Sequence, residues 1–160
     1  MRYSLYYILL SLLLCACAQG KGDVDPETEA GQLIAIARQL ITDSKYAEAK
    51  DTILYMRKEF PTAFNARATG IIVMDSAELM EAQDSLAVLI GELQREEVFL
   101  QQLEAESPNV RSAAFYKQRT KVFYQKQHLD EVNAKVKFFL RKIEIDQRKN
   151  EETPILKKTI

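Results

Sequence analysis

The apolar residues of the second half of the chain recur every seven residues, in two successive series. The first series contains Leu79, Leu86, Leu93 and Leu100, with Ala82, Leu89 and Leu103 at the companion position. The second series contains Phe115, Val122, Leu129, Val136 and Ile143, with companions Val132 and Phe139. Sustained heptads are typical of coiled-coil helices. Because the segment around Pro108 separates them, the pattern predicts an antiparallel helical hairpin over 77–149, with its turn near 106–110.

Folding at this turn predicts a register in which the numbers of paired residues sum to 218, and it places each apolar stripe against the other. Ser107 as N-cap and Pro108 in the first turn would start the second helix. Towards the turn the match weakens, since Leu100 then meets Gln118, Glu96 meets Val122, and Leu93 meets Gln125. We therefore expect the distal part of the hairpin to be less stable, or to bind something.

The charges of the two arms are complementary. Residues 71–107 hold nine acids against one base, whereas residues 111–149 hold eleven bases against four acids. Flanking charges of this kind select partner and orientation in coiled coils, although each exposed pair contributes little stability. The charges thus predict the same pairing as the heptads.

The first half of the chain has a helical period of a different kind. Apolar residues at three- and four-residue spacing run from Leu33 to Ile41, and a second series follows a polar break at 42–45. That series stops before Pro61, as helices tend to do. The pattern predicts two packed helices within the segment 30–76, and an all-α fold for the body of the chain.

The spacing of small residues in this segment resembles the tetratricopeptide repeat, a pair of antiparallel helices. Ala37 and Ala49 lie twelve apart, "KYAEAK" resembles the turn into the second helix, and Pro61 lies where the family's terminating proline lies. The resemblance implies helical hairpins that present surfaces to peptides and proteins. A second, degenerate copy would place Gly70 and Ala82 on two successive helices, with Asp75 as a cap between them. Ordinary packed hairpins with small residues at their contacts are the alternative.

The first residues have the order of a secretory signal peptide: a basic residue, an apolar run from Leu5 to Leu14, and then small residues. The run is shorter than the ~20 apolar residues of a membrane span. Leu14, Cys15, Ala16 and Cys17 resemble the bacterial lipobox. The resemblance implies cleavage before Cys17, which then carries fatty acyl chains such as palmitate. Ala18 in the next position is compatible with sorting to the outer membrane, on either its periplasmic or its exterior side.

An ordinary cleavage site formed by Ala16, Cys17 and Ala18 is the alternative, and it would release a soluble protein beginning at Gln19. In either case the signal peptide covers residues 1–16 or slightly more, and the polar stretch up to residue 29 predicts a flexible tether over 17–29. A second flexible tail is expected over 150–160. Cys15 and Cys17 are too close together for an unstrained disulfide and lack the neighbouring ligands of a metal site.

The sequence contains no catalytic constellation that we recognise. It has one histidine, His128, on a helix flank, and no Gly-rich phosphate loop. We expect neither an enzyme, nor a cofactor, nor a metal site. The net charge of −1, the acidic arm and the expected export also argue against a nucleic-acid partner.

Four aromatic residues lie near the turn but outside the heptad stripes: Phe99, Tyr116, Phe123 and Tyr124. Aromatic residues are enriched at the centres of protein interfaces, so they are candidates for partner contact; packing within the hairpin or a self-association seam is the alternative. The function we expect is that of an anchored, non-catalytic interaction or scaffold subunit of the bacterial envelope. A carrier or chaperone that holds an unfolded chain or a lipid between its helices is the second hypothesis.

Overall fold

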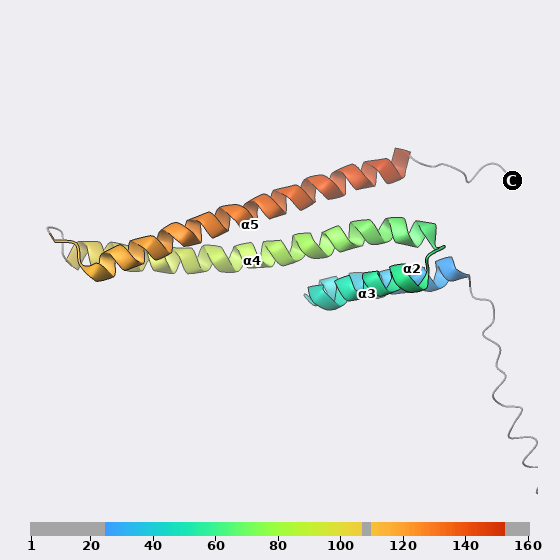
Figure 1. Ribbon diagram of the computed structural model, residues 1–160, viewed down its shortest axis with the longest axis horizontal. Coiled ribbons are helices and arrows are strands. Elements are labelled where there is room, and N and C mark those ends of the chain that lie inside the picture. Colours follow the sequence, from blue (N-terminus) through green and yellow to red (C-terminus); the bar gives the residue numbers. More distant parts are fainter. Residues whose placement is uncertain (1–24, 107–109, 153–160) are drawn as a thin grey trace, which may run out of the picture.

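The computed structural model describes residues 25–106 and 110–152, and these residues form an all-α protein. Its helices are α2 (Pro26–Thr42), α3 (Tyr46–Glu59), α4 (Phe64–Glu106) and α5 (Ala113–Glu152). The long helix α4 is central: α2 and α3 pack against its N-terminal half, while α5 runs antiparallel beside it (Figure 1). The expected all-α hairpins are therefore confirmed.

Helix α2 begins at Pro26, inside the segment expected to be a tether. Asp25 caps the helix by accepting a hydrogen bond from the backbone N–H of Glu27, Pro26 occupies the first turn, and Glu27 and Glu29 add negative charge there. Each of these features favours a helix N-terminus. The expectation of a tether up to residue 29 was thus wrong for its last four residues. It was based on polar composition, which does not distinguish a tether from the first turn of a helix.

The α2–α3 pair is built as its small residues predict. Helix α2 ends at Thr42, Ser44 follows with a left-handed φ of 57°, and α3 ends at Glu59, just before Phe60 and Pro61. Ala37 and Ala49 are both fully buried. Large side chains at these two positions would hold the helices apart, so their small size permits the observed packing.

The core of the protein lies between this pair and the first half of α4. Ile53 and Met56 on α3 are 0 % exposed, and they pack with Ile34 of α2 and Val73 of α4. Gly70 makes the approach of α4 close: a Cβ atom there would lie 2.9 Å from Met56 Cε and 3.3 Å from Ile34 Cδ1. We call α2, α3 and residues 64–82 of α4 the base.

The predicted second repeat does not form. Gly70 and Ala82 lie on one unbroken helix of 43 residues, so the expected boundary between 76 and 77 falls inside α4. Asp75 is not a cap either; it is 5 % exposed and pairs with Lys142 of α5. The segment has no helix-breaking residue, and a partner that is distant in sequence satisfies the carboxylate that suggested a cap.

Helix α5 confirms the antiparallel hairpin, and its ion pairs with α4 lie around the predicted register. The five ion pairs between the described residues of the two arms have sums from 213 to 223, on both sides of the predicted 218. The heptad residues of both arms are buried or half-buried, among them Ala82, Leu93, Phe115, Val122 and Val136. Both ends of α5 differ from the prediction. The helix begins at Ala113, where Ser112 Oγ accepts a hydrogen bond from the N–H of Phe115, and it continues to Glu152, so the tail expected over 150–160 is helical in its first three residues. Ser107 and Pro108 lie outside the described residues.

Candidate interaction surface

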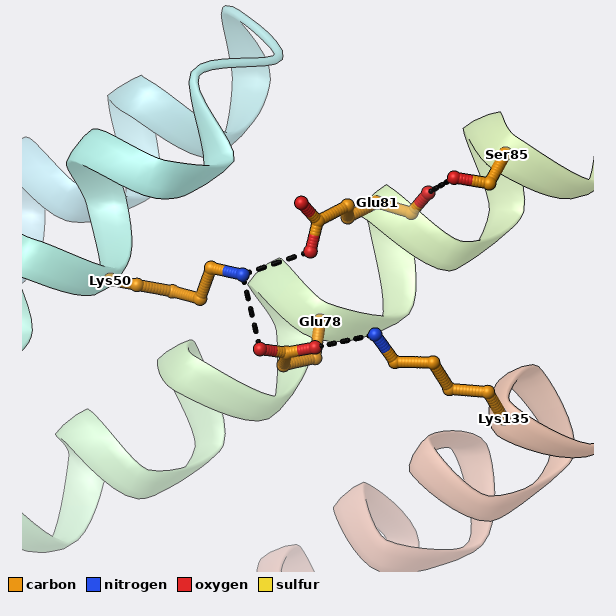
Figure 2. A network of polar contacts seen from close by, with 5 residues as sticks. All are labelled: Lys50, Glu78, Glu81, Ser85 and Lys135. Atoms are coloured by element: carbon orange, nitrogen blue, oxygen red, sulfur yellow. Dashed lines mark hydrogen bonds and ion pairs between the residues drawn. The ribbon is translucent and has the colours of Figure 1, made fainter. Parts of the chain in front are cut away.

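A polar network joins the base to the hairpin across α4. The Lys50 ammonium of α3 lies 3.1 Å from Glu78 Oε1 and 2.9 Å from Glu81 Oε2. The Lys135 ammonium of α5 reaches the other oxygen of Glu78 at 2.8 Å, so that one carboxylate bridges three helices (Figure 2). Ser85 completes the network by donating to the backbone carbonyl of Glu81 at 2.9 Å.

The network shifts the pKa values of Glu78 and Lys50 in the direction that keeps both side chains charged. The hydrogen bond from Lys135, together with that from Lys50, lowers the pKa of Glu78. The hydrogen bond to Glu81, more than that to Glu78, raises the pKa of Lys50. Both side chains remain ionised at neutral pH, and the network holds the relative position of α3, α4 and α5.

Two further contacts attach other parts of the chain to α4. The Tyr46 hydroxyl at the start of α3 donates to Asp84 at 2.5 Å, and this bond raises the pKa of the phenol. Glu27 of α2 accepts a hydrogen bond from the N–H of Ala66 and thereby caps the N-terminus of α4. The beginning of α2 and the beginning of α4 consequently lie together, at the end of the molecule opposite the hairpin turn (Figure 1).

The apolar mismatch predicted near the turn is resolved by polar contacts. The Gln118 amide donates to the backbone carbonyl of Glu96 at 2.9 Å and to its carboxylate at 2.7 Å, while Lys121 binds the other carboxylate oxygen at 2.7 Å. These hydrogen bonds, that from Gln118 above all, lower the pKa of Glu96. Gln125 lies at the next mismatch, and its buried Oε1 has no hydrogen-bond partner among the described residues.

The candidate contact residues of α5 are exposed and lie together. Tyr116, Phe123 and Tyr124 are 54 %, 57 % and 63 % exposed. With Arg119 and Thr120 they line a shallow hollow of about 320 Å³ on the face of α5 that points away from α4. We call these five residues, 116, 119, 120, 123 and 124, the distal patch.

The rings of the patch are held by their neighbours along the helix. Phe123 and Tyr124 meet edge to face with centroids 5.6 Å apart, and Tyr116 makes the same contact with the buried ring of Phe115. The Arg111 guanidinium lies 4.3 Å above the Phe115 ring. Such contacts orient exposed aromatic side chains before any partner arrives.

The fourth candidate, Phe99, does not line this hollow. It is half-exposed on α4 and belongs to the other arm of the hairpin. The sequence placed it near the others because it is close to the turn, but only spacings of three, four and seven along one helix bring side chains onto one face. The structure therefore groups three of the four residues.

The remaining candidates for chemistry in the sequence are the two cysteines and the histidine. Cys15 and Cys17 lie outside the described residues. His128 is exposed, with Nδ1 3.5 Å from Glu131 Oε2. Within 25–106 and 110–152 no cluster of three or more His, Cys, Asp or Glu side chains could hold a metal ion, and no helix in those ranges is both long and apolar enough to cross a membrane.

No protein-family model, curated protein or solved structure matches this chain. The resemblances to the tetratricopeptide repeat and to the lipobox therefore remain predictions from the sequence.

Proposed function

We propose that this protein is a lipid-anchored extracytoplasmic lipoprotein that acts as a non-catalytic interaction or scaffold subunit of the bacterial envelope. The observation that carries the contact role is the distal patch: three aromatic side chains, each more than half exposed, share one hollow. Exposed large apolar groups in isolation are ordinary, whereas a cluster around an arginine has the composition of an interface centre.

The arrangement of the helices supports a scaffold more than a carrier. The heptad residues between α4 and α5 fill the hairpin core, and the polar pairs fix its register. A carrier would need an enclosed apolar cavity between helices. The hollow of the distal patch is shallow and lined by α5 alone, and the hollow between Val88, Leu89 and His128 is open to solvent. The anchor at Cys17 and the outer-membrane location rest on the sequence.

Crosslinking in cells, followed by identification of the crosslinked proteins, tests the contact role. We expect Phe123→Ala/Tyr124→Ala to lose the main partner. Leu54→Ala/Tyr55→Ala, which removes an equally exposed pair from the base, is the matched control and keeps it. Partners unchanged in the first variant would contradict the proposal.

Labelling with a fatty acid tests the anchor separately. Wild type incorporates label and Cys17→Ala does not. Label that persists on Cys17→Ala would move the site to Cys15, and an unlabelled wild type would support secretion after cleavage before Gln19.

A further inference from the structure

The distal patch lies in a basic part of the chain. Residues 111–129 contain five lysines and arginines and no acid. The acids of α4 pair with three of the five bases: Glu104 with Arg111, Glu96 with Lys121, and Glu97 with Lys126. These three ion pairs join the two arms of the hairpin, so the three bases are already paired within the protein.

Lys117 and Arg119 are different. Both are exposed, and neither forms an ion pair or hydrogen bond with any residue of the described chain. Arg119 lines the hollow beside Tyr116, Phe123 and Tyr124. The patch thus combines uncompensated positive charge with exposed aromatic rings.

We infer that the distal patch binds an acidic amphipathic segment of a partner protein. This inference rests on the proposed function and adds the chemistry of the partner. A guanidinium forms paired hydrogen bonds with a carboxylate, so Arg119 binds acidic side chains, while Lys117, which does not line the hollow, adds only to the positive charge around it. The three rings cover apolar side chains of the same segment, and the tyrosine hydroxyls remain at the polar rim.

Two features favour a protein over an anionic membrane as the occupant. A helix that lies in a membrane surface needs a free apolar face, but the broad apolar face of α5 is packed on α4. The patch is also remote from the start of α2. Glu27 contacts Ala66, Gln118 contacts Glu96, and the 30 residues of α4 between Ala66 and Glu96 span about 45 Å.

Fluorescence anisotropy with the full chain and three labelled peptides tests this inference. The first peptide is an amphipathic helix of about 16 residues, a little over four turns, made of Glu, Leu and Phe. The second has Lys in place of every Glu, and the third has Ser in place of every Leu and Phe. We expect the wild-type protein to bind the first peptide. We expect its affinity for each of the other two peptides to be lower by a factor of roughly ten or more.

Matched charge reversals locate the binding. Arg119→Glu lowers the affinity for the first peptide by roughly tenfold at low salt, and Phe123→Ala/Tyr124→Ala lowers that affinity by a similar factor. Lys137→Glu makes the same charge change at an exposed base of α5 that is about 27 Å along the helix, and it leaves binding unchanged. Circular dichroism confirms that each variant keeps its helices.

Equal binding of all three peptides, or equal loss in Arg119→Glu and Lys137→Glu, would overturn the inference. So would binding to phosphatidylglycerol vesicles that Arg119→Glu abolishes while peptide binding is absent. If the cellular crosslinks depend on Phe123 and Tyr124 but the peptides show no preference for acids, the inference fails and the proposed function stands. If those crosslinks are unchanged in Phe123→Ala/Tyr124→Ala, the proposed function fails.

Discussion

The base and the distal hairpin, which is α4 beyond residue 82 with the part of α5 beside it, are built from the same kind of helix but are stabilised differently. The base surrounds fully buried apolar side chains such as Ile53 and Met56 with three helices. The distal hairpin has only two helices, so each heptad residue is covered from one side, and ion pairs and Gln118 complete its seam. The comparison teaches that burial from several sides stabilises the base, whereas the hairpin depends on a one-sided apolar seam and on its polar contacts.

The largest expected effect is the loss of a buried side chain in the base. Ile53→Ala should lower the free energy of unfolding by about 2–5 kcal/mol, because a fully buried isoleucine leaves a cavity. Leu129→Ala removes the same number of carbon atoms from a half-buried heptad position in the distal hairpin and should cost about half as much. Urea denaturation measures both; equal losses would contradict the difference between the two regions.

The close approach of α4 to the base gives the next effect. Gly70→Leu should destabilise the protein by about 1–3 kcal/mol, since even a Cβ there meets Met56 and Ile34. Gly91→Ala is the control: its Cβ would have no atom within 4 Å, and alanine favours the helix by about 0.5–1 kcal/mol. A stabilised Gly70→Leu would show that α4 is not held closely against the base.

The hairpin can instead be strengthened at its polar mismatch. Gln125→Leu should raise the free energy of unfolding by about 1 kcal/mol, because it replaces a buried carbonyl oxygen without a partner in the described chain by an apolar heptad residue. Gln127→Leu, on the exposed side of the same helix, should change stability by less than about 0.5 kcal/mol. A destabilised Gln125→Leu would contradict the register.

The smallest effect is the pH dependence of the network between the two regions. The folded state lowers the pKa of Glu78 below its ordinary value of 4.5, so the stability it contributes is present above that value and is lost as the pH falls through the folded pKa. Lys50 has a raised pKa, so its contribution is present below 10.5 and is lost as the pH rises through the folded pKa.

Urea denaturation over a pH series measures the free energy of unfolding as it falls at acidic and at basic pH, the acidic and basic limbs of the profile. Glu78→Gln should flatten the acidic limb, whereas Glu48→Gln, which replaces an exposed carboxyl of the base, should leave it unchanged. An unaltered acidic limb in Glu78→Gln would show that the network adds nothing to stability.

Much of the fold follows from periodic sequence features. The heptads, the break at 42–45 and the complementary charges predict the helices and their antiparallel pairing, because these signals are local and repetitive. The second repeat was mispredicted, since Asp75 has the spacing of a cap but is satisfied by Lys142, far away in sequence. No local pattern distinguishes these two roles of a carboxylate.

The candidate surface was predictable only in part. The aromatic residues near the turn were visible in the sequence, and three of the four share a face at helical spacing. The network around Glu78 was not visible, because Lys50 and Lys135 lie on different helices and meet only after both have packed on α4. Long-range polar contacts of this kind depend on the finished packing.

The central claim is that the distal patch, and not the base, meets the partner. A benzophenone side chain introduced in cells at position 120, in the patch, or at position 55, on the base, tests it most directly. We predict a protein crosslink from position 120 that Arg119→Glu reduces, and none from position 55. A protein crosslink from position 55 alone would contradict the account.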